Sequence, residues 1–143
     1  MSFIPESEIQ DSEILYRAIH PSFWNYEEDR PTSALFKDRK GVSVDRDGDR
    51  SEDDAVNFLL NSRQNFGAGN LNAGQTRNIG TYLKPDKTPE NDFHALILES
   101  ESKVQLSNSK AKKLSRVVTI INPPFNEEVQ STYANASLWE KTK

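Results

Sequence analysis

Residues 14–19, Ile-Leu-Tyr-Arg-Ala-Ile, are the stretch on which the predicted fold depends. They form a short run of aliphatic, aromatic and β-branched side chains, which is typical of a buried β-strand. The run ends at His20-Pro21, where proline has no backbone N–H to donate to a strand ladder. We therefore expect a first strand over residues 14–19 and a sheet built around it.

Further along the chain, segments with the composition of strands alternate with turn-rich links. The predicted strands are 42–46, 75–83, 93–98 and, as the short partner of 93–98, 103–106. The Gly- and Asn-rich stretch 65–74 is predicted to be loop or turn. Residues 32–37 are ambiguous between a helical turn and an extended segment.

Two segments predict helices. Ser51 can cap free backbone amides and Asp54 stands at the capping-box position, so a helix is expected over 52–62. The acids of its first turn favour the positive end of the helix dipole. A second helix begins at Ser107 or Ser109, runs through about Val118, has Ile121 on its apolar side and is stopped by Asn122-Pro123-Pro124.

The composition is that of one domain with loosely held ends. The chain has 143 residues, of which 34% are hydrophobic. The predicted organisation is an acidic flexible leader (1–13), a single globular domain (14–122) and a partly docked tail (123–143) with Tyr133, Leu138 and Trp139. The fold class that follows is α+β, a small mostly antiparallel sheet of four to six short strands with two packing helices.

Several classes of protein are excluded by the residues that are missing. Without cysteine there can be no disulfide, no thiolate metal site and no cysteine nucleophile. Zinc would need carboxylates together with the two histidines, His20 and His94, and we predict no metal. No stretch approaches the ~18 apolar residues of a membrane span. We expect a soluble, cytoplasmic protein with no membrane partner.

Charge is unevenly distributed within a net charge of -4. Residues 1–54 hold 14 acids and 7 bases, whereas residues 55–143 hold 8 acids and 11 bases. This asymmetry indicates either a basic face for a polyanion opposite an acidic face, or an ordinary solvated surface.

Two motif-like segments are incomplete. The three aspartates between Asp45 and Asp49 fit the first ligand positions of an EF-hand loop, but Arg50 stands where glycine is needed and Val56 where the bidentate acid is needed. We interpret this segment as a solvated acidic turn before a helix. Residues 67–74 lack the Gly-Lys-Ser/Thr ending of a P-loop, and we interpret them as a flexible connection.

Polar residues in or beside the predicted strands are candidates for a site. A buried Arg17 would need a partner carboxylate, a bound anion or an edge position. His20 could act as acid, base or hydrogen-bond donor, and His94 could approach it, although either could be purely structural. Ser43 and Asp45 share one face of their strand, which is a polar site if that face opens into a cleft.

Two further groups could contact a partner. Phe23, Trp24 and Tyr26 form an aromatic cluster that is either core or a stacking platform. Basic residues of the second helix either contact phosphates without reading a sequence or form a solvated face. They are Lys110, Lys112, Lys113 and Arg116, with Lys103 beside them.

Three stretches together resemble a set of small uncharacterised bacterial proteins. They are Leu15 to Pro21 (Leu-Tyr-Arg-Ala-Ile-His-Pro), Arg30 to Asp38 (Arg-Pro-Thr-Ser-Ala-Leu-Phe-Lys-Asp) and Gly41 to Arg46 (Gly-Val-Ser-Val-Asp-Arg). The resemblance implies a prokaryotic or phage setting and no particular function.

Leu15-Tyr16-Arg17, Gly41-Val42-Ser43 and Glu99-Ser100-Glu101 follow the order of the arginine, serine and glutamate motifs of arginine-type ADP-ribosyltransferases, which this chain thereby resembles. The resemblance implies that Arg17 holds the phosphates of NAD, Ser43 supports the nicotinamide pocket and Glu101 stabilises the oxocarbenium-like centre. The chain lacks the usual Ser-Thr-Ser form of the serine motif, and its glutamate arrives early in the sequence.

Two classes of function remain. The first is a small binding or accessory protein that acts through a protein partner or a polyanion, with no cofactor. Its predicted ligand-binding residues are Arg17, Arg46, Trp24, Lys112 and Lys113. The alternative is a small nucleotide- or NAD-handling enzyme, with a polar cleft around Arg17, Ser43 and His94. Its predicted catalytic residues are Arg17, His20, Ser43, His94 and Glu101.

Overall fold

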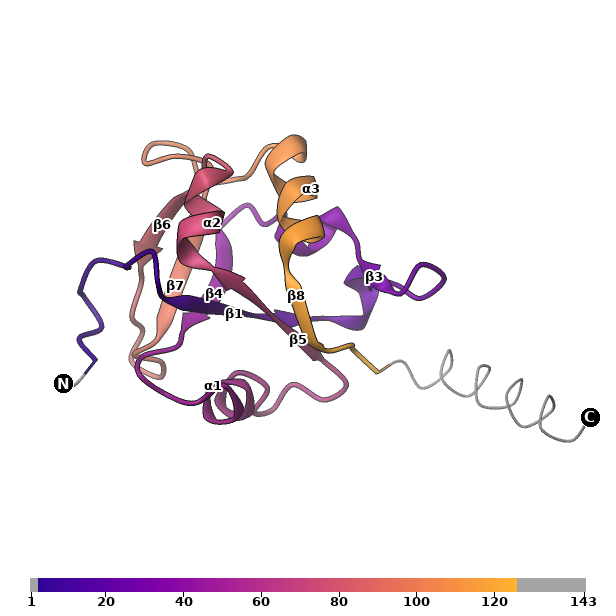
Figure 1. Ribbon diagram of the computed structural model, residues 1–143, viewed down its shortest axis with the longest axis horizontal. Coiled ribbons are helices and arrows are strands. Elements are labelled where there is room, and N and C mark those ends of the chain that lie inside the picture. Colours follow the sequence, from indigo (N-terminus) through magenta and orange to yellow (C-terminus); the bar gives the residue numbers. More distant parts are fainter. Residues whose placement is uncertain (1–2, 126–143) are drawn as a thin grey trace, which may run out of the picture.

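A six-stranded antiparallel sheet organises the chain, as a computed structural model of residues 3–125 shows (Figure 1). Its strand order is β6-β7-β4-β1-β5-β8. The strands are β1 Ile14–Ile19, β4 Val42–Arg46, β5 Gly67–Asn72, β6 Tyr82–Pro85, β7 His94–Leu98 and β8 Thr119–Asn122. The predicted fold class is confirmed, while Tyr133, Leu138 and Trp139 lie outside the described residues.

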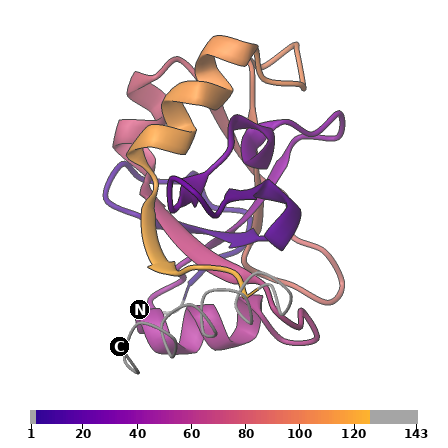
Figure 2. The same ribbon diagram turned by 90° about the vertical axis from the view of Figure 1, so that its right-hand side faces the viewer.

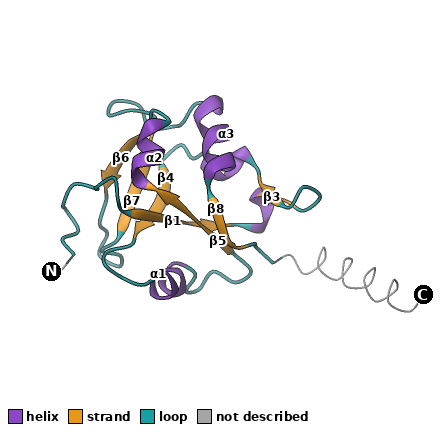
Figure 3. Cartoon of the chain, in the orientation of Figure 1, coloured by secondary structure: helices purple, strands orange, loops and turns teal. Residues whose placement is uncertain are grey.

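The remaining elements are short, apart from two of the helices (Figure 3). They are 3₁₀ turn η1 Pro21–Phe23, strands β2 Trp24–Asn25 and β3 Arg30–Pro31, 3₁₀ turn η2 Ser33–Phe36, and helices α1 Glu52–Leu59, α2 Ala73–Asn78 and α3 Asn108–Val117. Strands β2 and β3 pair with each other in a separate two-stranded sheet. Figure 2 shows α1 on one side of the large sheet and α3 on the other.

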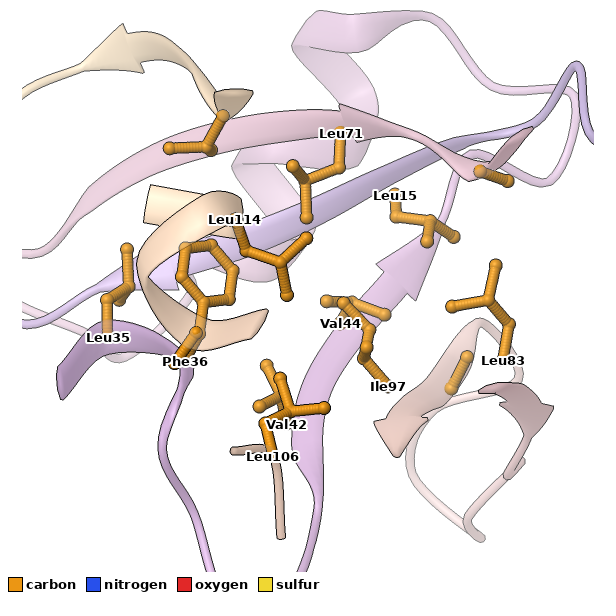
Figure 4. Packing of buried hydrophobic residues seen from close by; sticks show 14 of the residues in the cluster. Leu15, Leu35, Phe36, Val42, Val44, Leu71, Leu83, Ile97, Leu106 and Leu114 are labelled. Atoms are coloured by element: carbon orange, nitrogen blue, oxygen red, sulfur yellow. The ribbon is translucent and has the colours of Figure 1, made fainter. Parts of the chain in front are cut away.

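The main core lies on the side of the sheet that α3 and η2 cover. Leu15 and Val44 project from the middle strands toward Leu114 of α3 and Phe36 of η2 (Figure 4). All four side chains are at most 1% exposed. Because burying such a side chain stabilises the fold by roughly 1.5–3 kcal/mol, this side supplies most of the hydrophobic stabilisation.

Helix α1 covers the opposite face with a smaller apolar cluster. Its buried residues Ala55, Val56 and Leu59 pack against Tyr16 of β1. Ser51 caps the helix as predicted, its Oγ accepting from the N–H of Asp54 at 3.1 Å. The helix ends at Leu59, three residues before the predicted end, so this face is covered only in part.

The prediction of a loop over 65–74 is wrong. Residues 67–72 form β5, which pairs with β1 along all six residues. Glycine marks loops, but it also marks places where another backbone approaches closely. A Cβ at Gly67 would meet the carbonyl oxygen of Asn122, and one at Gly69 would lie 2.8 Å from Cγ2 of Val118. The glycines therefore let β8 reach the sheet.

The predicted strand 75–83 is also incorrect over most of its length. Residues 73–78 form α2, and the strand β6 begins only at Tyr82. Asn72 explains the difference, because its Oδ1 accepts from the N–H of Gln75 and caps the helix. The asparagine that suggested a loop is therefore a helix start.

Two predictions near the C-terminal end of the domain need correction. Residues 103–106 form no strand, and β6 takes the place beside β7 that they were expected to fill. The second helix starts after Ser107 as predicted, but it ends at Val117, and Ile121 belongs to β8. The β-branched run from Val117 to Ile121 favours an extended chain, which accounts for the early end.

The N-terminal segment contacts the sheet and α2. Ile9 is only 2% exposed, and the carbonyl oxygens of Asp11 and Glu13 accept from the N–H groups of Gly74 and Ala73, both at 3.0 Å. The division of the chain into leader, domain and tail stays a prediction.

Replacement of Gly67 by alanine tests whether close approach explains β5. We expect Gly67→Ala to lower the free energy of unfolding by about 3 kcal/mol, because a rigid carbonyl, not a side chain, occupies the space a Cβ needs. Urea denaturation measures the change. Gly74→Ala is the control, because its Cβ would meet the Cβ of exposed Asp11 at 3.0 Å and alanine favours the helix. An equal loss of stability in both variants would contradict the explanation.

Candidate functional site

The candidate site lies where β1 and β4 separate. These strands pair through Leu15 with Arg46 and Tyr16 with Asp45, and the described ladder has no further pair. The next residue of β1, Arg17, reaches across the gap. Its Nη1 donates to the carbonyl oxygen of Ser43 at 2.9 Å, in the place of a ladder hydrogen bond.

Arg17 also binds the carbonyl oxygen of Leu35 through Nε at 3.2 Å and Nη2 at 2.8 Å. Its strand is central, which excludes an edge position, and the hydrogen bonds that its guanidinium makes within residues 3–125 go to main-chain carbonyl oxygens. Burial lowers the pKa of Arg17 to about 10, and nearby Asp38 opposes that shift. Arg17 therefore joins main-chain segments at the gap.

A row of polar side chains crosses the sheet beside Arg17. Asp45 of β4 lies opposite Tyr16 of β1 on one side and His94 of β7 on the other. Directly paired residues of antiparallel strands present their side chains on the same face. The row therefore runs along the face that α1 covers, while Val44 and Arg46 of β4 project to the other face.

Asp45 is the most unusual member of this row, because its carboxylate is buried and only half satisfied. The residue is 3% exposed, and its Oδ1 accepts from Nδ2 of Asn91 at 2.8 Å. Its Oδ2 is buried and has no hydrogen-bond partner among the described residues. Leaving a buried acceptor unpaired costs about 1–3 kcal/mol, and more when it is charged.

His94 is held in a defined orientation. Its Nδ1 lies 2.9 Å from the carbonyl oxygen of Asp86 and 3.0 Å from Oδ2 of the same residue. Two acceptors at Nδ1 favour the tautomer with the proton on that nitrogen. Nε2 then carries the lone pair, and no residue in the described range forms a hydrogen bond with it. The ring is oriented as a hydrogen-bond acceptor or a base would be.

These residues border a small cleft of about 90 Å³, which we call the Asp45 cleft. Its polar lining consists of Arg17, Ser43, Asp45, Arg63, Asn91 and His94. The sequence predicts a polar site at Ser43 and Asp45 if their face of the strand 42–46 opens into a cleft. The structure shows that this face does so. Three residues of the predicted enzyme site, Arg17, Ser43 and His94, are brought together there.

Other residues predicted for that site lie elsewhere. The Nδ1 atom of His20 accepts from the N–H of Ser22 at 3.0 Å, and its ring packs edge-on against Phe66. Glu101 is exposed in the turn after β7 and does not line the cleft. Its neighbour Glu99 forms an ion pair with Lys110, which lowers the pKa of Glu99.

Arg46 is a structural residue on the opposite face. It is 1% exposed, and its Nε and Nη2 bind the two carboxylate oxygens of Glu13 at 2.7 and 2.9 Å. Nη1 donates to the carbonyl oxygen of Ser7 at 2.8 Å and to that of Pro5 at 3.2 Å. These contacts come from the segment before β1, so the predicted ligand-binding role of Arg46 has no exposed surface to act through.

A second, larger cleft of about 320 Å³ lies between α3 and the β2–β3 hairpin, and we call it the basic cleft. Lys112, Ser115 and Arg116 line it from one face of α3, since residues three and four apart are neighbours on a helix. Arg30 of β3 lines the opposite wall and pairs with Glu28 at 2.8 Å. Both side chains of this pair are more than half exposed, so the pair contributes little.

The other predicted ligand-binding residues are not part of this cleft. Lys113 is exposed on α3 but is not among the lining residues. Trp24 is 6% exposed and belongs to the main core, with Phe23 and Tyr26 packed against the same cluster. The core interpretation of the aromatic segment is therefore confirmed.

Sequence reasoning missed Asn91, Arg63 and Asp86. Asn91 and Asp86 stand in turn-rich segments on either side of Pro89, where polar residues are expected whatever their role. A pairing of 42–46 with 93–98 would have placed Asp45 beside His94, but nothing local in the sequence specifies that pairing.

Comparison of the chain with known protein families, curated proteins and solved structures yields no match. The two resemblances stated from the sequence therefore depend on the quoted residues alone. Residues 3–125 contain no cluster of three or more His, Cys, Asp or Glu able to hold a metal ion. No helix in this range is long and apolar enough to cross a bilayer.

A neutral substitution of Glu13 tests the structural role of Arg46. We expect Glu13→Gln to lower the free energy of unfolding by about 3 kcal/mol, because it leaves a buried guanidinium without its counter-charge. Chemical denaturation measures the change. Glu8→Gln is the matched control, since its side chain is exposed and its contact with Arg46 is through the main chain. A change below about 0.5 kcal/mol in both variants would contradict this role.

Proposed function

We propose that this protein is a binding protein for a phosphate-bearing polyanion, which it contacts through the basic cleft. The observation that carries the proposal is the convergence of Arg30, Lys112 and Arg116 on one cleft of about 320 Å³. Glu28 is the one acid in the lining, and its ion pair with Arg30 is solvent-exposed. An arriving phosphate can therefore displace Glu28 at little cost.

The chemistry of the lining suits phosphate. Guanidinium groups bind phosphate oxygens with two parallel hydrogen bonds, and lysine adds a point charge. Ser33 and Ser115 contribute hydroxyl groups to the same lining. Contacts of this kind position a polyanion without reading its sequence.

The distribution of charge supports the same proposal. The acidic first turn of α1 lies across the sheet from α3 (Figure 2), so the acids of that turn are separated from the basic cleft. A net charge of -4 would repel a polyanion from most of the surface, which restricts binding to the local positive cleft. The expectation of a protein partner stays a prediction. Of the two surfaces predicted for it, the aromatic segment is packed in the core, and the basic helix lines the basic cleft.

Charge removal inside and outside the basic cleft tests the proposal. We expect Lys112→Ala and Arg116→Ala each to weaken binding of a short labelled single-stranded RNA several-fold in fluorescence anisotropy. The slope of log K against log salt should fall by about 0.7 for each phosphate that the variant no longer neutralises.

Lys113→Ala is the matched control for this experiment, because Lys113 is an exposed cation on the same helix but outside the cleft lining. It should bind as the unaltered protein does. Equal weakening by all three substitutions would indicate a general effect of net charge and would rule out the basic cleft as the site.

A second candidate function is a small NAD-handling enzyme of the ADP-ribosyltransferase type. It is favoured by the meeting of Arg17, Ser43 and His94 in the Asp45 cleft. Glu101 is not among the residues that line this cleft, and Arg17 is used in main-chain contacts; both observations count against this candidate. Glu101 is the residue that the resemblance gives the chemical role, so it provides the test.

On this candidate, the protein releases nicotinamide from NAD, and Glu101→Gln abolishes the release. Glu101 is exposed, so the substitution leaves the fold intact. Chromatographic detection of nicotinamide over time measures the activity. Absence of release, or equal release by the variant, would eliminate this enzyme function without affecting the polyanion proposal.

A further inference from the structure

The Asp45 cleft combines an unpaired acceptor with unused donors. The acceptor is Oδ2 of Asp45, which is buried and lacks a partner among the described residues. Arg17 uses only part of its N–H groups on the carbonyl oxygens of Leu35 and Ser43, and one N–H of Arg63 binds the carbonyl oxygen of Leu59. Arg17 and Arg63 both line the cleft that Asp45 lines.

The charge of this lining restricts the class of ligand. A cation bound to Asp45 would lie in the same cleft as two positively charged residues, Arg17 and Arg63, which repel it. A simple anion would meet the carboxylate of Asp45 and leave Oδ2 unpaired. A neutral group that carries a hydrogen-bond donor beside an acceptor satisfies both sides of the cleft.

The size of the cleft restricts the ligand further. Its volume of about 90 Å³ corresponds to roughly three water molecules at about 30 Å³ each. That space accepts a planar group of a few heavy atoms, such as one edge of a small ring, and it excludes a whole nucleotide. A rigid planar group also loses little conformational entropy on binding.

From these observations we infer that the Asp45 cleft binds the amide edge of a small planar ligand, a neutral group with adjacent N–H and carbonyl. The N–H donates to the carboxylate of Asp45, and the carbonyl oxygen accepts from Arg17 or Arg63. His94, fixed through Nδ1 by Asp86, offers Nε2 as a second acceptor at the same cleft. This site is separate from the basic cleft and does not depend on the polyanion proposal.

The arrangement predicts discrimination between ligands that differ by one donor. A site built to pair a buried polar group rejects an analogue that lacks the partner, because the protein group is then left unpaired. Uracil presents an N–H beside a carbonyl, whereas dimethyluracil has both ring N–H groups methylated. Uracil should bind with a dissociation constant on the order of 1 mM, as expected for so small a ligand, and dimethyluracil should bind at least about tenfold more weakly.

The experiment is a titration of the whole chain with uracil and with dimethyluracil, followed through the backbone amide signals in two-dimensional NMR. We expect uracil to shift the signals of Asn91 and His94, whose side chains line the cleft. Equal shifts with dimethyluracil would overturn the proposal. Absence of shifts with both uracil and acetamide would overturn it as well, and would show that the cleft holds water only.

The substitution Asp45→Asn replaces the acceptor Oδ2 with an NH₂ group, which is a hydrogen-bond donor. An asparagine can still accept from Asn91 through its oxygen, but its NH₂ group then opposes the N–H of the ligand. We expect uracil binding to fall at least about tenfold, while thermal denaturation shows that the variant remains folded. Asp49→Asn makes the same change at an exposed position and should leave binding unaltered.

Arg63→Ala keeps the proposal testable if the asparagine variant fails to fold. Arg63 is exposed, so its removal should not unfold the protein, and uracil binding should weaken several-fold. Unchanged binding in both Asp45→Asn and Arg63→Ala would place the ligand elsewhere and refute the inference.

Discussion

The joint between β1 and β4 is the constraint on which the rest of the structure depends. In the described residues, the ladder between the half-sheet β6-β7-β4 and the half-sheet β1-β5-β8 has two residue pairs, extended by one hydrogen bond from the N–H of Asp47 to the carbonyl oxygen of Ile14. Past these pairs the strands part, and the Arg17 guanidinium takes over the carbonyl group of Ser43 that a continuous ladder would have paired. A fully paired sheet would have no gap at this point, so the Asp45 cleft exists because the joint is short.

Because side chains alternate along β4, the residues that stabilise the core lie on one face of the strand and the residues that line the Asp45 cleft lie on the other. Val42, Val44 and Arg46 face the larger core, where Arg46 is enclosed by the N-terminal segment. Ser43 and Asp45 face the side where α1 ends at Leu59 and leaves part of the sheet uncovered. The basic cleft belongs to neither face, because α3 and the β2–β3 hairpin form it. The two clefts thus differ both in chemistry and in the elements that form them.

Local patterns in the sequence predict the elements whose signals are local. The strand at 14–19 and the start of α1 at Ser51 depend on runs and caps that act within a few residues, and both were found as predicted. The strand at Gly67–Asn72 was missed because its glycines serve contacts with β8, some fifty residues away in sequence. The meeting of Asp45 with His94 depends on strand register, and the partners of Arg17 are carbonyl groups that every residue possesses. Residue types alone therefore predict neither the strand register nor the main-chain partners of Arg17.

The enclosure of Arg46 has a consequence for how this protein can vary among relatives. Part of the coordination of the guanidinium comes from main-chain oxygens of Pro5, Ser7 and Glu8, which are present whatever the side chains are. Substitutions at exposed positions of this segment, such as Glu8, can therefore accumulate while its path over Arg46 is kept, whereas Ile9 is part of the core. A profile of sequence variability would show those exposed positions as unconstrained next to an invariant arginine and glutamate, and would understate the part of the segment in the fold.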